Sequence, residues 1–381
     1  MKGPLSPGAF RSRLHDERIA SYLGVALGVA FAICFMTGLY SHVLQTQPTW
    51  LRFPSRPAGL YRVTQGLHVA TGIAAIPLLF AKLWTVYPKL WRWPPLESIA
   101  HALERITLLP LVGGSLFLLM TGIYNTFGWY PWFKFSFPAA HFWAAWITIG
   151  SLIVHIGAKA GIARAALRRG VGSQPAGSTG VGGLTRRGFL GSVAATSGLL
   201  TAATVGQSLS PLGRIAALAP RRPGNGPQRL PVNKSAREAH LTDVARDPSW
   251  RLRIEGAVEN PLVLSLGDLR AMEQHEATLP ITCVEGWSAT GRWRGVRVRD
   301  LLERAGAAPH RDVFVESLQQ AGAAYRSSIL PPAHAGDPDT LLALDLNGEP
   351  LHIDHGFPAR LIAPNRPGVL QTKWVARMEV L

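Results

Sequence analysis

Two cysteines occur in the 381-residue chain, and they lie far apart in different surroundings. Cys34 lies in an apolar run and is expected to be buried packing. Cys283 lies in the stretch Thr282-Cys283-Val284-Glu285-Gly286-Trp287-Ser288. A structural disulfide between such distant thiols is not expected. Cys283 is therefore predicted to be a free thiol, which is either used for chemistry or simply buried.

Two histidines within an apolar segment form the second candidate site. His141 and His155 are fourteen residues apart, which is nearly four helical turns, so both rings share one helix face and are separated by roughly 21 Å along the axis. Imidazole is a common axial ligand of haem iron. Two b haems at these depths would carry electrons across a membrane. Histidines inside membrane spans are costly and are functional hypotheses by default.

Each haem needs a second ligand at a matching depth. His68 opens the second apolar segment and suits His141, whereas His15 precedes the first segment and suits His155. His42 and His101 lie at similar depths and could replace His68 and His15. The spacing leaves these alternatives open, including the one in which some of these side chains are interfacial histidines hydrated by water.

The elements that must position these histidines are apolar stretches of about 20 residues, the length that crosses a bilayer as a helix. Lys and Arg concentrate in the N-terminal tail and in the connections after the second and fourth stretches, so the N-terminus is predicted to be cytoplasmic. Five spans then place the C-terminal domain outside the cytoplasm, in an inner membrane protein. The predicted spans are Ile19–Ser41, Leu67–Val86, Ile106–Tyr124, Phe142–Gly161 and Phe189–Leu209.

The first four spans resemble the di-haem cytochrome b subunits of formate dehydrogenases and nickel-iron hydrogenases, in which the fourth helix likewise carries two histidines. The resemblance covers about Arg11 to Gly161 and rests on spacing and topology. It implies a four-helix membrane bundle that exchanges electrons with quinone or quinol. The net charge of +16 does not point to nucleic acid, because the basic residues of this half flank apolar segments and form no single stripe.

A Gly- and Ser-rich stretch from Gly170 to Gly183 has the composition of a flexible linker. It ends in Thr185-Arg186-Arg187-Gly188-Phe189-Leu190, which looks like an internal twin-arginine export signal. The alternative is an ordinary basic flank of a membrane helix. Ala217-Leu218-Ala219 is a possible cleavage site, but a retained anchor is the favoured prediction because it keeps the membrane half attached.

The C-terminal part reads as short strands separated by Gly and Pro turns, with few helices, so a β-rich α+β domain is expected. Ser265 is expected to cap a helix over Leu266–Gln274, and a second helix is expected over Val298–Ala305. Strands are expected, among others, at Trp250–Ile254, Leu262–Leu264, Val313–Val315, Arg360–Ala363 and Val375–Val380.

An ordered set of motifs in this part carries a second resemblance. It comprises Leu279 to Ser288 around Cys283, Trp293-Arg294-Gly295-Val296, His355-Gly356-Phe357-Pro358-Ala359-Arg360 and Lys373-Trp374-Val375. From about Leu230 to Leu381 the chain resembles the molybdopterin-binding domain of the sulfite oxidase family, and within it the catalytic subunits of periplasmic methionine sulfoxide reductases. The resemblance implies a molybdenum-molybdopterin enzyme.

The resemblance also implies roles for single residues. Cys283 would ligate molybdenum as a soft thiolate, leaving positions for the pterin dithiolene and oxo groups. Arg360 and Lys373 would hold the pterin phosphate, and His355 would bond the pterin. Secondary polar contacts would come from Asn233 and Ser317, and main-chain contacts from Gln371 and Thr372.

Two departures from the family are expected to matter. Sulfite oxidases continue into an immunoglobulin-like dimerisation domain, whereas this sequence stops at Leu381, so a family-type homodimer is not expected. The segment Pro367 to Lys373 is less basic than in relatives, so phosphate contact there is expected to depend on Lys373.

The sequence therefore predicts a multidomain protein, an all-α membrane helix bundle followed by a β-rich α+β molybdopterin domain. Its predicted activity is oxygen-atom transfer outside the cytoplasm, reducing an S-oxide or N-oxide with electrons from the quinone pool. Sulfite oxidation in the reverse direction, a cytochrome with a non-catalytic binding domain and a haem-free anchor are the alternatives. The predicted boundaries are 1–165 for the four-helix domain, 166–187 for the linker with its twin-arginine motif, 188–209 for the fifth helix, 210–229 for a tether and 230–381 for the molybdopterin domain.

Overall fold

The structure is a computed structural model that describes residues 12, 14–91, 99–131, 134–168, 185–208, 213, 215–222 and 224–381. The side chains of residues 90–101, 103 and 104 are also outside the description, which includes the alternative haem ligand His101. Most of the predicted linker, residues 169–184, falls outside it as well, as do residues 209–212, 214 and 223 of the fifth-span end and tether.

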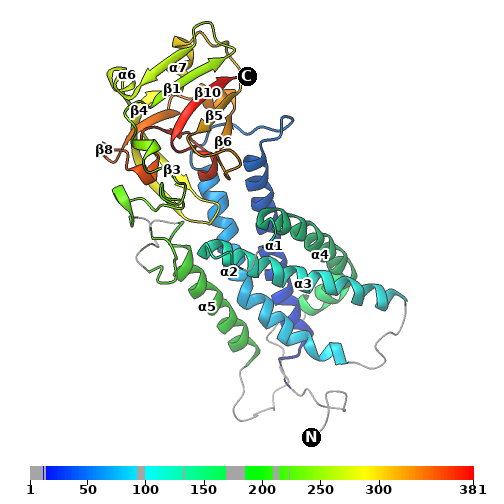
Figure 1. Ribbon diagram of the computed structural model, residues 1–381. Coiled ribbons are helices and arrows are strands. Elements are labelled where there is room, and N and C mark those ends of the chain that lie inside the picture. The colour runs from blue at the N-terminus through cyan, green and yellow to red at the C-terminus, as the bar shows by residue number, and fades with distance from the viewer. Residues whose placement is uncertain are drawn as a thin grey trace. The chain divides into compact units, whose positions relative to one another are not determined.

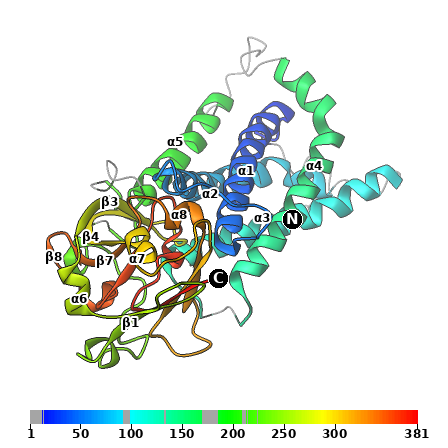
Figure 2. The ribbon, with the colours of Figure 1, turned by 90° about the horizontal axis from the view of Figure 1, so that it is seen from above.

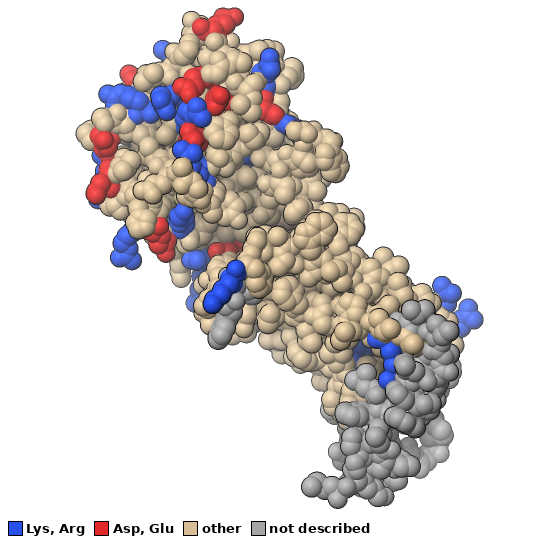
Figure 3. Space-filling view, turned by 45° about the vertical axis from the view of Figure 1, so that its right-hand side comes forward, with Lys and Arg blue, Asp and Glu red and all other residues tan. Residues whose placement is uncertain are grey.

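Five helices are long and apolar enough to cross a membrane, as the hydropathy pattern predicts. The first four helices extend beyond the predicted spans, because helical hydrogen bonding continues past the edge of the apolar stretch. The fifth helix also begins early, at Arg186, but ends at Val205, before the predicted end of its span at Leu209. Their exposed surface is largely apolar, and in the view of Figure 3 it carries few charged side chains. The helices are α1 (Glu17–Thr46), α2 (Leu60–Val86), α3 (Ile99–Phe127), α4 (Phe137–Arg168) and α5 (Arg186–Val205), with a 3₁₀ turn η1 at Tyr87–Trp91.

The helices pack through small apolar contacts. Leu27, Ala30, Ala75 and Leu79 join α1 to α2. Helices α3 and α4 approach closely at Gly114, where an added Cβ would overlap the Thr148 side chain. Helix α5 packs on the bundle as well. Its contacts include Val193 in a cluster with residues of α1 and α2, and a hydrogen bond from Ser197 Oγ to Ala74 O (3.1 Å).

The C-terminal part contains two sheets (Figures 1 and 2), and the predicted β-rich α+β class is confirmed. One sheet has the order β2-β1-β10-β5-β6, so the last strand of the chain lies in its middle, parallel to β1 and antiparallel to β5. Its strands are β1 (Arg251–Gly256), β2 (Leu262–Ser265), β5 (Val313–Ser317), β6 (Ser327–Leu330) and β10 (Val375–Val380).

The other sheet has the order β3-β4-β7-β8, with β9 also paired to β7. Every residue of β7 is buried, which a strand covered on both faces requires, and this is why it shows no alternating pattern in the sequence. Strand β4 alternates buried and exposed side chains over most of its length. The strands are β3 (His275–Thr282), β4 (Ser288–Arg297), β7 (Leu341–Leu346), β8 (Glu349–Pro350) and β9 (Arg360–Ile362).

Short helices cap these sheets. Helix α6 (Leu266–Ala271) begins at a capping box in which Ser265 Oγ accepts from Asp268 N and the Asp268 carboxylate accepts from Ser265 N, so the predicted cap is confirmed. The remaining helices are α7 (Val298–Arg304) and α8 (Pro332–Ala335), with 3₁₀ turns η3 (Pro227–Arg229), η4 (Val244–Arg246), η5 (Ile353–His355) and η6 (Gly368–Leu370).

The chain divides into two compact units whose boundaries cut through α1 and α2. The helical unit contains residues 1–38 and 67–204, and the β-rich unit contains residues 39–66 and 205–381. The segment Leu39–Gly66, placed by sequence in the membrane domain, is thus grouped by its contacts with the β-rich unit.

Candidate functional site

Cys283 directly follows β3 and begins the turn that leads into β4. Its amide donates to Trp287 O (2.9 Å), and Gly286 turns the chain with a φ of 92°, a conformation that suits glycine. Cys283 and Cys34 are both free thiols, as predicted. Burial and the nearby carboxylate of Glu285 raise the pKa of the Cys283 thiol to about 12. A thiol in this position ionises readily when a bound metal cation supplies the compensating charge.

Two buried cations flank one glycine near this turn. Gly356, with a φ of 114°, lies between Arg360 and Lys373, and a Cβ at Gly356 would come within 3.2 Å of the Cβ atoms of both. Arg360 stands in β9 over the Trp293 ring, and Lys373 precedes β10 beside the Trp374 ring. Lys373 is also within electrostatic range of Cys283. The fold therefore gathers Cys283, Arg360 and Lys373, which are far apart in the sequence.

The charges of these two cations are poorly compensated. Arg360 Nη1 donates to His355 O (3.1 Å), but its buried Nε has no hydrogen-bond partner among the described residues. Burial lowers the pKa of Arg360 to about 9, and burial together with Arg360 lowers the pKa of Lys373 well below its usual value. A buried, unpaired guanidinium is costly without an anion. This arrangement fits the phosphate of a pterin cofactor.

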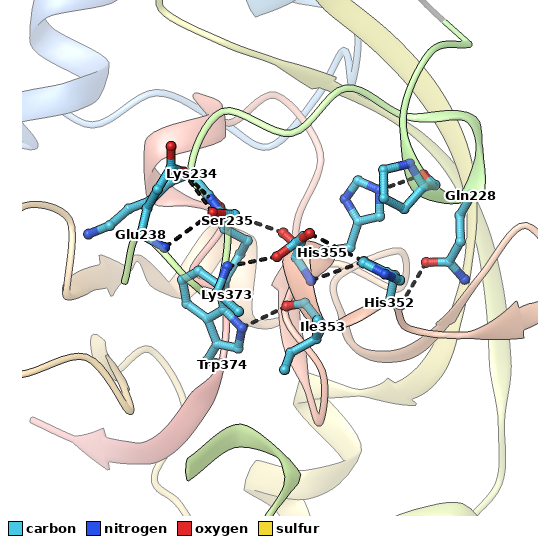
Figure 4. A network of polar contacts seen from close by, with 12 residues as sticks. Gln228, Lys234, Ser235, Glu238, His352, Ile353, His355, Lys373 and Trp374 are labelled. Atoms are coloured by element: carbon cyan, nitrogen blue, oxygen red, sulfur yellow. Dashed lines mark hydrogen bonds and ion pairs between the residues drawn. The ribbon is translucent and has the colours of Figure 1, made fainter. Parts of the chain in front are cut away.

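Lys373 anchors a polar network (Figure 4). Its Nζ donates to the main-chain oxygens of Lys234 and Asp354. Lys234 Nζ in turn donates to Gln319 Oε1 (2.6 Å), and Gln319 N donates to Ser317 Oγ (3.3 Å). The predicted residues Ser317 and Lys373 are thus connected through two residues that the sequence reading did not select, Lys234 and Gln319.

His355 ends η5 and is buried. Its Nε2 donates to Pro227 O (2.7 Å), so the Nδ1 atom is left as the acceptor of a neutral ring. Burial, followed by the charge of Arg360, lowers the pKa of His355 to about 4. The imidazole is therefore neutral near pH 7 and is suited to accept a hydrogen bond from a ligand.

The remaining predicted site residues, Asn233, Gln371 and Thr372, bond other groups of the protein. Asn233 is exposed, and its side chain accepts from Lys234 N (3.0 Å). The Gln371 side chain bonds both main-chain groups of Ala363, and its own amide donates to Gly368 O. Thr372 O accepts from Leu361 N, and its hydroxyl bonds Ser328. Gln371 and Thr372 thus have clear structural roles that hold the segment before Lys373 in place.

Tyr325 is a further candidate site residue that was not predicted from the sequence. Burial and the charges of Cys283 and Glu285 raise its pKa, which places its hydroxyl within electrostatic range of Cys283. The residue has a φ of 59°, an unusual conformation for a tyrosine, and unusual backbone geometry concentrates at functional sites. Neither feature can be recognised in the sequence.

In the helical unit, the rings of His68 and His141 lie 6.4 Å apart between centroids, at an interplanar angle of 63°. A metal ion held at about 2 Å from one nitrogen of each ring separates the centroids by about 6 Å. His68 Nδ1 donates to Cys34 O (2.9 Å), and His141 Nδ1 contacts Thr121 Oγ1 (2.8 Å). A proton on Nδ1 leaves Nε2 as the ligating atom. The centroid separation of the pair therefore matches that of two imidazoles that hold one iron.

The inner candidates are placed differently. His15 Nδ1 contacts Thr85 O (3.2 Å), and its ring stacks on Trp84 at 4.7 Å. His155 lies in α4. The pairing of His15 with His155 stays a prediction.

The C-terminal part has known relatives. Residues 239–381 match the family model described as the oxidoreductase molybdopterin binding domain. Mitochondrial sulfite oxidase of Rattus norvegicus is 36% identical over 172 residues, covering 37% of this chain and 31% of the relative. The uncharacterized oxidoreductase YuiH of Bacillus subtilis (strain 168) is 33% identical over 127 residues, covering 33% of this chain and 62% of the relative.

Among solved structures, the sulfane dehydrogenase SoxCD from Paracoccus pantotrophus is 29% identical, covering 35% of this chain and 38% of the matched chain, with a TM-score of 0.32. The chain spans about a third of the length of the mammalian sulfite oxidases that it matches. The C-terminal part is a molybdopterin-binding domain of the sulfite oxidase family of oxidoreductases.

Proposed function

We propose, from this family membership of the C-terminal part, that the protein is a membrane-anchored molybdenum oxidoreductase. It exchanges electrons between the quinone pool and a substrate outside the cytoplasm through b haems. The observation that carries the proposal is the convergence of buried Cys283 with Arg360 and Lys373, two buried cations that need an anionic ligand.

The residues of the site take the following roles. Cys283 ligates molybdenum, Arg360 and Lys373 hold the pterin phosphate, and the neutral His355 bonds the pterin. Asn233 and Ser317 hold the polar network around Lys373, while the main chain of Gln371 and Thr372 orients Lys373. When bound, the molybdenum cofactor supplies two-electron oxygen-atom-transfer chemistry.

The helical unit supplies the electron route. The closeness of the His68 and His141 rings favours His68 over His42 as the second outer ligand. His15 with His155 would hold an inner haem. Bound haem supplies one-electron transfer. Five apolar helices in a bilayer, with the more basic connections in the cytoplasm, orient the C-terminal domain outward.

Helix α5 is proposed to remain as an anchor. Arg186, the first arginine of the twin-arginine motif, pairs with Asp16 (2.7 Å), and Phe189 contacts the Trp84 ring. These contacts pack α5 against other helices of the bundle. A signal helix that is cleaved off after export would not need such contacts.

The proposed reaction is the reduction of an S-oxide or N-oxide. An S-oxide takes two electrons and two protons, releases its oxygen as water and leaves a thioether, while quinol is oxidised to quinone. The reverse direction is the alternative. Sulfite then gains an oxygen from water and two electrons pass to quinone, and the sulfite oxidase relatives favour this candidate.

The test uses the purified full chain and membranes that contain it. Metal analysis and visible spectra should show molybdenum together with reduced b-type bands. Methionine sulfoxide should oxidise the pre-reduced haems, whereas sulfite would reduce oxidised haems if the reaction runs the other way. If the protein contains haem but no molybdenum, it is a cytochrome with a non-catalytic domain. If it contains molybdenum but shows no b-type bands, the helical part is a haem-free anchor.

The Cys283→Ser variant tests the ligand assignment. Turnover should fall by more than the roughly 10- to 100-fold caused by altering an outer-shell partner, while the haem spectrum is retained. Cys34→Ser, which removes the other thiol, is the control and should stay active. Unchanged turnover in Cys283→Ser would refute the assignment.

A further inference from the structure

The turn Cys283–Ser288, which we call the cysteine turn, is held by residues from outside the family domain. Its internal hydrogen bonds run from Cys283 N to Trp287 O and from Gly286 N to Cys283 O. Further polar groups of the turn find partners in two other segments, the beginning of α2 and the chain that follows α5 up to Arg221. Both segments belong to the same compact unit as the turn.

Gln65 makes the first of these contacts. It lies in the second turn of α2, the residue is 5% exposed, and its Nε2 donates to Val284 O (3.1 Å). Val284 directly follows the proposed metal ligand. Val284 is half-buried, and a hydrogen bond of this kind contributes about 0.5 to 1.5 kcal/mol, which favours the observed conformation of the turn.

The residues after α5 make the second set of contacts. Ser288 N donates to Gln207 O (2.8 Å), and Ser208 Oγ donates to Gly286 O. Gln207 and Ser208 are almost completely buried. They hold the end of the turn opposite to Val284.

A third contact fixes the carboxylate of the turn. Glu285 Oε2 accepts from Arg221 Nε (3.3 Å) and from Trp287 Nε1 (3.1 Å). Arg221 also donates to Val232 O (2.8 Å). The acidic side chain next to Cys283 is thereby kept in place.

We propose that Gln65 and Ser208, with the main chain of Gln207, are positioning residues for the metal-ligand turn. The first residues of α2 and the residues that follow α5, all in the same compact unit as the turn, thus supply the hydrogen-bond partners that fix where the Cys283 sulfur lies. The identity of the metal rests on the proposed function, but the fixing of the turn does not. A metal site requires its ligand to be held to within a fraction of an ångström, so these distant residues set the geometry of the centre.

The first test measures the reactivity of Cys283 in the cofactor-free full chain. The variants are Gln65→Met, which keeps length without a donor, and Ser208→Ala. Gln45→Met is the matched control, because Gln45 bonds Ser41 and not the turn. Maleimide labelling is followed by peptide mass spectrometry, which separates Cys283 from Cys34.

Loss of one buried hydrogen bond should increase opening of the turn, so Cys283 labelling should rise about 5- to 10-fold in both variants. The control should label at the wild-type rate, and Cys34 labelling should be equal in all four proteins. Equal Cys283 rates in wild type, Gln65→Met and Ser208→Ala would overturn the proposal. This result is independent of whether the wild-type protein carries molybdenum.

The second test uses the protein purified with its cofactor. The g values of the electron paramagnetic resonance signal of the one-electron-reduced molybdenum should change in Gln65→Met and Ser208→Ala. The haem bands of both variants should be unchanged, and their melting temperatures should be similar to that of Gln45→Met. A signal identical to wild type in both variants would show that the contacts are structural only. A wild-type protein without molybdenum would refute the proposed function, and the labelling experiment would still decide the positioning role.

Discussion

Arg360 is a buried cation whose charge is poorly compensated by the protein itself. Its side chain is buried, its Nε lacks a hydrogen-bond partner among the described residues, and the nearby Lys373 has the same sign of charge. Burial of such cations destabilises the cofactor-free domain, and an anionic cofactor would reverse this effect.

The variant Arg360→Leu should therefore have opposite effects on stability and cofactor retention. The cofactor-free chain should gain about 1 to 3 kcal/mol in its free energy of unfolding, because a buried unpaired charge is removed. The molybdenum content of the purified protein should fall. Chemical denaturation and metal analysis measure the two quantities, with Arg311→Leu, at an exposed arginine, as the control. A destabilised cofactor-free protein would contradict this account.

His355 makes the stability of the cofactor-free protein depend on pH. Its folded-state pKa of about 4 lies below the usual value of 6.5, so the unfolded state binds more protons between these two values. The contribution of His355 to stability is complete above about pH 6.5 and is lost as the pH falls towards 4. His355→Gln should flatten this pH dependence in denaturation curves, whereas His310→Gln, at an exposed position, should not. An unchanged slope would mean that folding does not lower the pKa of His355.

At the scale of the helices, the pair of His68 and His141 depends on small neighbours. Gly38 in α1 lies against the His68 ring, where an added Cβ would come within 3.0 Å of Cε1. Thr121 in α3 fixes the His141 ring, because its hydroxyl donates to Phe117 O (2.7 Å) and is left to accept from His141 Nδ1. Three helices besides α4 thus determine the orientation of the two imidazoles.

Thr121→Val should raise the midpoint potential of the proposed outer haem. Losing the acceptor for Nδ1–H makes the His141 imidazole a weaker donor to iron, which destabilises the oxidised state relative to the reduced one. Redox titration of the b-type bands measures the change. Thr126→Val, at a threonine of α3 whose hydroxyl bonds Gly122 O, is the matched control. A lower or unchanged potential would refute the role of Thr121.

At the scale of the whole molecule, the β-rich unit is built from two distant parts of the sequence. Asn365 bonds the segment Leu39–Gly66 at several points. Its amide donates to Ala58 O (3.0 Å), its Oδ1 accepts from Tyr61 N (2.9 Å), and its Nδ2 donates to Pro54 O (2.9 Å). The connection between the first two helices is therefore an integral part of this unit.

Arg56→Ala tests how much this connection contributes to stability. Arg56 pairs with Asp337 (2.8 Å), whose side chain is only 4% exposed, and with Asp339. Removing the guanidinium leaves a buried carboxylate without its cation, although Asp339 N still donates to it, so the unit should lose about 1 to 3 kcal/mol. Arg52→Ala, which breaks the more exposed pair with Asp312, should cost less than about 1 kcal/mol. Thermal unfolding of the full chain compares them, and equal losses would contradict the burial argument.

The sequence by itself determined the features that depend on local composition. Hydropathy over about 20 residues identifies the five helices, because a span must be apolar whatever it packs against. The Ser265 cap is local in the same way, and the motifs around Cys283, Arg360 and Lys373 identify the molybdopterin domain from residue types in order.

The tertiary structure decided the features that depend on contacts between distant segments. Strand β7 is buried on both faces and so has no alternating pattern, and the network of Lys234, Gln319 and Lys373 joins three segments. The contact of Gln65 with the cysteine turn spans more than two hundred residues. None of these has a sequence signature, because a hydrogen-bond partner that is distant in the chain is selected by the packing of the fold and not by neighbouring residues.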